Sequence, residues 1–173
     1  MRQRGFSLLE MTLAVAIMGI AAAAVTLNVM SPIRRATMED IVGQIAAFDN
    51  MTRTWARNQD RPLIMTVDIS EGRIYRGREN NAEPTESLKI PKSFRISRLV
   101  VGGSEIAYGD AEIPFSGMGL SPTYAMLIEG KGSPARWIIV VGLTGEVLTE
   151  TDAKGEKAVR DIFEAIVRRD EPR

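Results

Sequence analysis

The first strong pattern in the chain is an apolar run over residues 6–30 that contains a single formal charge, Glu10. As an α-helix rising about 1.5 Å per residue, this run is about 37 Å long and exceeds the roughly 30 Å hydrocarbon core of a bilayer. The preceding residues MRQRG are basic, and basic flanks of a membrane helix tend to stay in the cytoplasm. The pattern predicts one membrane-spanning helix, with everything after Met30 outside the cytoplasm.

Apolar residues continue at helical spacing beyond this run, which predicts a helix that packs on a sheet. The apolar stripe consists of Met38, Ile41, Ile45, Phe48, Met51 or Thr52, and Trp55. The polar side is expected to hold Glu39, Asp40, Asp49, Arg53 and Arg57. Pro32 predicts a kink because it removes a backbone hydrogen bond. One helix is therefore expected over about residues 6–58.

The pattern then changes to the two-residue alternation of β-strands, punctuated by glycine-containing turns. Strands are expected at 63–69, 73–76, 94–101, 105–108, 113–115, 124–129, 137–141 and 146–149, with a polar loop over 77–87. Apolar residues at helical spacing return near the end and predict a short helix over 156–169. The expected fold class is α+β: a long N-terminal helix, membrane-spanning in its first half, packed on an antiparallel β-rich head, with a short C-terminal helix.

The composition excludes several kinds of catalytic and metal-binding site. The chain has no Cys and no His, which excludes disulfides, thiol nucleophiles, His general bases and Cys or His zinc sites. The acidic clusters at 110–112 and 150–152 lack the spacing of a calcium loop and are expected to be solvated turns. Gly117 and Gly119 are turn residues, since GMGLSP lacks the third glycine of a dinucleotide fingerprint. We expect that the chain is not an enzyme, that it has no catalytic residue, and that it binds no cofactor and no metal.

Charge is balanced overall, with 22 Lys plus Arg and 22 Asp plus Glu, but it is distributed unevenly. Residues 51–98 contain ten basic and six acidic residues, a local net of +4, whereas residues 99–173 contain eight and twelve, a local net of −4. Such asymmetry orients subunits or attracts anions, although a solvated surface is the commoner explanation. If the head binds nucleic acid, a less favoured possibility, Arg73, Arg76 and Arg78 are the expected contacts.

Glu10 decides between three interpretations of the first thirty residues. They are a secretory signal removed near the alanines at 21–24, a plain signal anchor, or a helix that needs its carboxylate. A carboxylate inside a spanning helix costs about 2.5 to 3.5 kcal/mol on insertion scales, so it indicates a function and a charged partner.

Gly5, Phe6 and Glu10, within RGFSLLEMTLAVAIMGIAAA, resemble the class III signal of type IV pilins and type II secretion pseudopilins. The resemblance implies that prepilin peptidase cleaves between Gly5 and Phe6, that Phe6 is then N-methylated, and that Glu10 is required for assembly. Cleavage would place a positive amine on Phe6 in the apolar zone, about one helical turn from Glu10. In a filament, Glu10 of one subunit can meet the Phe6 amine of its neighbour and so set the axial register.

The head resembles the minor pseudopilin H and FimT-like (GspH/FimT) family in three segments: ARNQDRPLIMTVD, IPFSGMGLSP and RWIIVVGLTGEV. The expected organisation is a leader at 1–5, a transmembrane and assembly helix at 6–30, a helical spine at 31–59, a β-rich GspH-like head at 60–151 and a C-terminal helix and tail at 152–173. This last segment lies outside the resemblance.

The resemblance implies a minor pseudopilin of a type II secretion system, a structural part of the periplasmic pseudopilus that supports protein export. The alternative is a minor type IV pilin of FimT or FimU type, which primes pilus assembly or binds DNA in uptake. The expected location is the bacterial inner membrane, crossed once, with the head in the periplasm. The expected partners are prepilin peptidase and other pseudopilins in a hetero-oligomeric filament.

Overall fold

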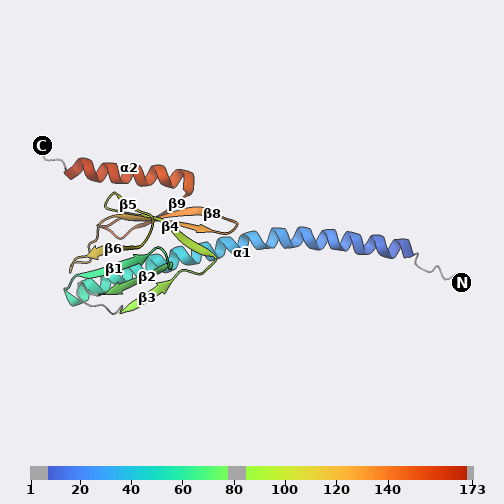
Figure 1. Ribbon diagram of the computed structural model, residues 1–173, viewed down its shortest axis with the longest axis horizontal. Coiled ribbons are helices and arrows are strands. Elements are labelled where there is room, and N and C mark those ends of the chain that lie inside the picture. Colours follow the sequence, from blue (N-terminus) through green and yellow to red (C-terminus); the bar gives the residue numbers. More distant parts are fainter. Residues whose placement is uncertain (1–7, 78–84, 171–173) are drawn as a thin grey trace. The chain divides into compact units, whose positions relative to one another are not determined.

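The computed structural model describes residues 8–77 and 85–170 (Figure 1). The chain forms two compact units that divide between Thr37 and Met38. Helix α1 (Leu8–Gln59) begins in the first unit and ends in the second, and helix α2 (Asp152–Asp170) closes the second unit. The strands are β1 (Leu63–Asp68), β2 (Arg73–Gly77), β3 (Glu86–Lys89), β4 (Phe94–Val101), β5 (Ser104–Ile106), β6 (Asp110–Phe115), β7 (Tyr124–Gly130), β8 (Ser133–Val140) and β9 (Val147–Thr151).

The end of α1 is set by its local sequence. Asp60 takes the left-handed conformation with φ 46°, its N–H donates to the carbonyl of Arg57, and the N–H of Arg61 donates to the carbonyl of Ala56. This pair of reversed hydrogen bonds is a Schellman cap, which satisfies carbonyls that the last helical turn leaves open. Pro62 follows and cannot continue the helix.

The strands of the second unit form two antiparallel sheets. The smaller sheet has the order β3-β2-β1-β6, and the larger has the order β5-β4-β7-β8-β9. Pro114 lies in β6, at an edge of the smaller sheet, where a strand tolerates a residue without an N–H. The chain passes between the two sheets from β3 to β4, from β5 to β6 and from β6 to β7.

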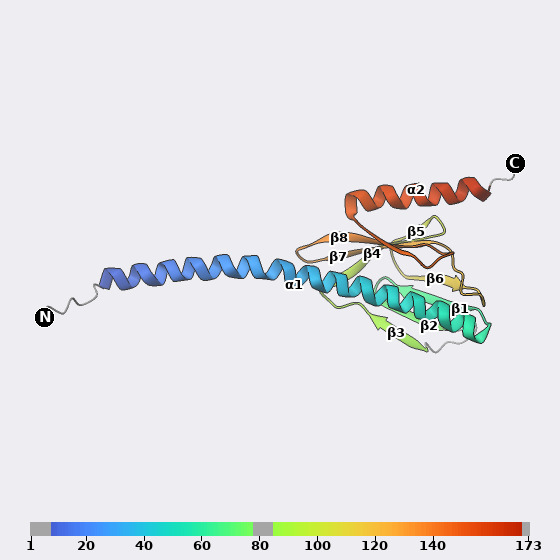
Figure 2. The same cartoon turned by 180° about the vertical axis from the view of Figure 1, so that it is seen from behind.

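The main core lies between the C-terminal half of α1 and the inner faces of both sheets. Met38, Ile41 and Ile45 of α1 are buried there, together with alternate residues of the strands. A second, smaller core covers the outer face of the larger sheet, where Val159 and Phe163 of α2 pack with Trp137. Figures 1 and 2 show the larger sheet between α2 on one side and the smaller sheet on the other.

This layering explains the burial of the central strands. Five consecutive residues of β7, from Tyr124 to Ile128, are buried, because one face of the strand meets the main core and the other meets the core under α2. In β8 the division is visible residue by residue: Trp137 and Ile139 belong to the outer core, whereas Ile138 and Val140 belong to the main core.

The α+β fold class is confirmed, with its N-terminal helix, antiparallel sheets and C-terminal helix. The helix remains continuous across Pro32, and the kink expected there stays a prediction. The prediction of a polar loop over 77–87 was partly wrong, since β3 begins at Glu86 and pairs with β2. The acidic cluster at 110–112 lies on strand β6 rather than in a turn, and the one at 150–152 spans the end of β9 and the start of α2.

The predicted apolar stripe of α1 was correct from Met38 to Phe48. Of the two alternatives at the next position, Thr52 is buried and Met51 is exposed. The prediction was wrong at Trp55, which is exposed, whereas Ala56 is buried. Asp49 and Arg53, both expected on the polar side, are also buried. Asp49 and Arg53 can be buried because they form an ion pair with one another inside the protein.

Candidate functional site

The N-terminal motif lies at and before the start of α1. Gly5 and Phe6 fall outside the described residues, whereas Glu10 lies in the first turn of α1. Cleavage at Gly5, methylation of Phe6 and the assembly role of Glu10 stay predictions.

The first unit exposes an apolar surface on this part of α1. The exposed large apolar side chains here are Leu8, Met11, Leu13, Val15, Ile17 and Met18. Large apolar side chains exposed at so many positions of a helix favour contact with an apolar environment. Among the described residues, no helix has a stretch both long and apolar enough to cross a membrane. The membrane span over residues 6–30 therefore stays a prediction.

Inside the head, α1 is fastened by a buried ion pair. Arg53 Nε donates to Asp49 Oδ2 at 2.6 Å, one helical turn away, and the two side chains are 5% and 1% exposed. The hydroxyl of Tyr124, on β7, donates to Asp49 Oδ1 at 2.8 Å. Burial, then the neighbouring Asp49 carboxylate, raises the pKa of Tyr124 well above its ordinary value of 10.0, which keeps the phenol a donor.

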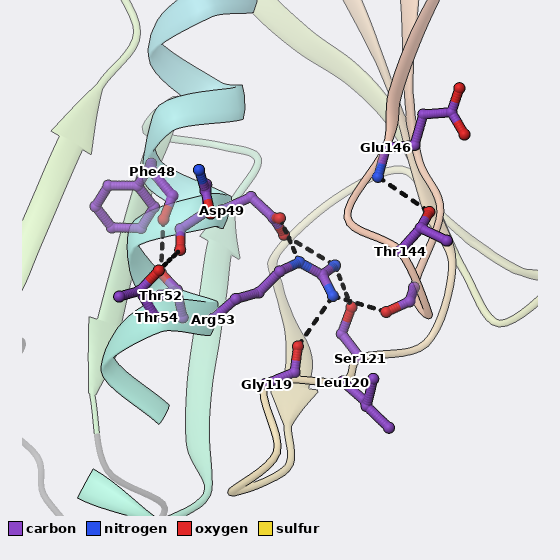
Figure 3. Close-up of polar contacts among 12 residues, drawn as sticks. Phe48, Asp49, Thr52, Arg53, Thr54, Gly119, Leu120, Ser121, Thr144 and Glu146 are labelled. Atoms are coloured by element: carbon purple, nitrogen blue, oxygen red, sulfur yellow. Dashed lines mark hydrogen bonds and ion pairs between the residues drawn. The ribbon is translucent and has the colours of Figure 1, made fainter. Parts of the chain in front are cut away.

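Arg53 also reaches two loops at the far side of the core (Figure 3). Its Nη1 donates to the carbonyls of Gly119 at 3.1 Å and Gly142 at 2.7 Å, and its Nη2 donates to Ser121 Oγ at 2.8 Å. We call Asp49, Arg53 and Tyr124, with these three loop acceptors, the polar anchor. It ties the helix that carries the N-terminal motif to β7 and to the loops after β6 and β8.

Two glycines make room for the polar anchor. Gly119 has φ +73°, and a Cβ there would lie 2.8 Å from the carbonyl oxygen of Arg53. A Cβ on Gly142 would overlap the backbone of Ser121 and Pro122. These positions fall in the segments IPFSGMGLSP and RWIIVVGLTGEV. Gly119 allows the loop after β6 to approach α1 closely, and Gly142 allows the loop after β8 to approach the loop after β6.

The sequence pattern does not predict the polar anchor, because Asp49 and Arg53 fall on the polar side of the helical stripe. The available signal was their spacing of four residues, which allows opposite charges to pair on a helix. That spacing does not reveal burial, which here depends on loops 66 to 89 residues further along the chain.

The basic residues named for a nucleic-acid surface do not form one in the described part of the chain. Arg76 is 2% exposed, pairs with Glu86 and lies 4.3 Å from the centroid of the Trp55 ring. Arg73 is exposed, and Arg78 falls outside the described residues. Arg76 is therefore unavailable for phosphate contacts, which corrects the expected trio.

Acidic residues do not gather into a metal site over residues 8–77 and 85–170, where no three or more potential ligands lie close enough to share an ion. In β6, Asp110 and Glu112 point outward and Ala111 is buried between them. These carboxylates form a solvated strand face.

Comparisons with known proteins bear on the N-terminus. Residues 1–26 match the family model for the prokaryotic N-terminal methylation motif. No curated protein sequence matches the chain. The chain is similar to two crystal forms of the type IV minor pilin FimU of Pseudomonas aeruginosa (strain PAO1), each at 13% identity. One covers 68% of this chain and 90% of FimU with a TM-score of 0.49, and the other covers 65% and 91% with a TM-score of 0.47. The N-terminal 26 residues of this chain therefore carry the prokaryotic N-terminal methylation motif.

Proposed function

We propose that the chain is a minor pseudopilin, a structural subunit of the periplasmic pseudopilus of a type II secretion system. The observation that carries the proposal is the order Gly5, Phe6, Glu10 at the head of an apolar helix, within the matched methylation motif. Prepilin peptidase removes residues 1–5, and the new N-terminal amine on Phe6 becomes methylated. The chain acts as a structural part and not as an enzyme.

Before assembly, residues 6–30 hold the subunit in the inner membrane, with the head in the periplasm. The exposed apolar side chains between Leu8 and Met18 are suited to lipid and to the helices of neighbouring subunits alike. On assembly, the helix leaves the lipid and packs against the helices of neighbouring subunits. Glu10 then pairs with the Phe6 amine of a neighbour, because a misplaced subunit would leave a charge unpaired in an apolar environment.

The head acts as an adaptor toward other pseudopilins. The polar anchor supports this role, because it fixes the C-terminal half of α1 within the head.

The alternative is a minor type IV pilin of FimT or FimU type. The basic excess of residues 51–98 favours it, because a pilin that captures DNA needs cations for phosphates. The burial of Arg76 and the buried pairing of Arg53 with Asp49 remove two of these ten cations from the surface, which leaves the secretion role ahead.

A deletion strain tests the proposal. Without the chain, export of type II cargo should fail while surface pili persist, and the wild-type chain should restore export. Loss of pili with intact export would support the alternative, and no change in either would contradict both. Complementation with a Glu10→Ala chain should restore export poorly. Glu39→Ala is the matched control and should restore export, because Glu39 is an exposed acid on the same helix but lies in the head.

A further inference from the structure

The smaller sheet has one face in the main core and one face outside it. Val67 of β1, Ile74 of β2 and Ile113 of β6 belong to the main core. Because side chains alternate along a strand, the residues next to them lie on the opposite side of the sheet, which we call the outer face. The charged residues at one end of the outer face are Asp68 of β1, Arg73 of β2, Lys89 of β3 and Asp110 of β6.

The strand register aligns these four charges in one row across the sheet. Asp110 pairs with Asp68, which pairs with Arg73, which pairs with Lys89. With neighbouring strands about 4.8 Å apart, the two ends of the row, Asp110 and Lys89, are separated by roughly 14 Å. The row therefore has a negative half on β6 and β1 and a positive half on β2 and β3.

The charges of this row are poorly compensated within the chain. Asp110 lies opposite Asp68, and Lys89 lies opposite Arg73, and like charges that face one another across strands are destabilising. Asp68 also lies opposite Arg73, but no ion pair among the described residues joins these two side chains. Instead, Asp68 Oδ1 accepts a hydrogen bond from the N–H of Glu71 at 2.9 Å. A partner with the reverse order of charges would relieve the repulsion in both halves.

The row is complementary to itself. A half-turn about an axis parallel to the strands, between β1 and β2, brings a second copy face to face and reverses the order of its charges. Lys89 of the second copy then lies over Asp110, and Arg73 of the second copy lies over Asp68. Two-fold symmetry repeats both contacts, so each residue of the row meets an opposite charge.

The next row along the strands fits the same arrangement. The register places Glu112, Thr66, Tyr75 and Ser87 across the sheet in that order. The half-turn brings the Ser87 hydroxyl of the second copy, a hydrogen-bond donor, over the Glu112 carboxylate. It also brings Tyr75 over Thr66. Glu71 lies in the turn between β1 and β2, beyond the strands that carry the two rows.

We propose that the outer face of the smaller sheet is a self-association surface on which a second copy of this chain docks face to face about a two-fold axis. Charge complementarity selects the second copy as the occupant, because the order acid, acid, base, base matches its own reverse. The contact is weak and sensitive to salt, since exposed ion pairs contribute little and are screened. It involves the heads alone and does not depend on the proposed function.

The test measures association of the full chain in nonionic detergent by fluorescence energy transfer. The chain contains no cysteine, so Ser104→Cys, at an exposed position on β5 of the larger sheet, provides one site for a donor or an acceptor dye. Energy transfer between donor-labelled and acceptor-labelled copies should rise with protein concentration. It should fall when the salt concentration is raised.

Two charge reversals at the ends of the row test the arrangement. Asp110→Lys places a cation over Lys89 of the second copy, and Lys89→Glu places an acid over Asp110. Each variant alone should associate about tenfold more weakly than wild type, because two exposed contacts per dimer change from attraction to repulsion. An equimolar mixture of the two variants should restore association, because opposite charges then meet at both ends. The double variant Asp110→Lys with Lys89→Glu should restore it for the same reason.

Glu150→Lys is the matched control, because Glu150 is an exposed acid on β9 of the larger sheet, and this variant should associate like wild type. Absence of energy transfer between wild-type chains at every concentration would overturn the proposal. Single reversals that associate like wild type would overturn it too, because they would assign the association to another surface. Failure of both the mixture and the double variant to restore association would show that residues 89 and 110 do not meet.

Discussion

Gly155, in the first turn of α2, packs directly against the indole ring of Trp137. A Cβ on residue 155 would overlap Cδ1 and Cγ of the ring, so only glycine allows α2 to approach the sheet this closely. Glycine inside a helix costs about 1 kcal/mol relative to alanine. The close contact with Trp137 explains why the helix carries this unfavourable residue.

Gly155→Ala should therefore destabilise the head, even though alanine favours helices. Displacing either α2 or the indole costs about 1 to 3 kcal/mol as overpacking, which exceeds the gain in helix propensity. Thermal unfolding followed by tryptophan fluorescence should show a lower Tm. Gly43→Ala provides the control, since a Cβ there meets nothing within 4 Å and the variant should be slightly more stable. A Gly155→Ala protein as stable as Gly43→Ala would contradict the packing argument.

Arg53→Met should be severely destabilising. It leaves the Asp49 carboxylate buried without its cation, and breaking a buried pair by removing one partner costs about 3 to 5 kcal/mol. Urea unfolding of the full chain measures the loss, and Arg57→Met, an exposed arginine one turn further along, should change stability by less than about 0.5 kcal/mol. The double variant Asp49→Leu with Arg53→Met should recover part of the loss. Strict additivity of the two substitutions would refute the pairing.

Stability should fall at alkaline pH because of Tyr124. Its folded-state pKa is raised above 10.0, so the unfolded chain releases the phenolic proton first as the pH rises. The contribution is fully present below pH 10.0 and is lost as the pH rises toward the folded pKa, at a limiting slope of about 1.4 kcal/mol per pH unit. Free energies of unfolding across this range should fall less steeply in Tyr124→Phe than in wild type. Tyr108→Phe is the control, because Tyr108 is 85% exposed. Identical slopes in wild type and Tyr124→Phe would show that the phenol does not titrate as argued.

Cleavage and methylation at the N-terminus should leave a specific covalent change in the chain. The membrane-extracted chain should have lost MRQRG and gained one methyl group at Phe6, which intact-mass and N-terminal peptide analysis would detect. Gly5→Leu should block cleavage, because a side chain there would keep the backbone away from peptidase groups. Recovery of a soluble product cut among the alanines at 21–24 would instead indicate an ordinary secretory signal.

Glu10→Ala should separate insertion from assembly. The variant should still insert, because it removes a charge that costs about 2.5 to 3.5 kcal/mol within a spanning helix. It should enter filaments poorly, since the Phe6 amine of its neighbour then lacks a partner. Membrane fractionation and sheared-filament immunoblots measure the two steps. Normal incorporation of Glu10→Ala would remove the charge-pairing argument.

Local patterns were sufficient to locate most secondary structure in the head. Strand β4 and the turn from β1 to β2 follow from alternating apolar residues and glycine, and the end of α1 falls within one residue of the expectation. Periodicity records which face of an element is apolar, and that information is local. Strand β3 was not predicted, because its sequence ESLK contains a single apolar residue. It forms a strand at the edge of the sheet by pairing with β2.

The N-terminal methylation motif over residues 1–26 is also recognisable from sequence alone, since it depends on residue type and spacing. Tertiary structure decided the rest. Asp49, Arg53 and Arg76 look like surface residues in the sequence and are buried in the fold, where partners from other elements complete their contacts: the Tyr124 hydroxyl, the Gly142 carbonyl and the Trp55 ring. The division of the strands into two sheets, and the position of α2 over Trp137, likewise depend on long-range packing. Burying a charge is favourable only when distant groups satisfy it, and no local pattern shows which distant groups the fold brings together.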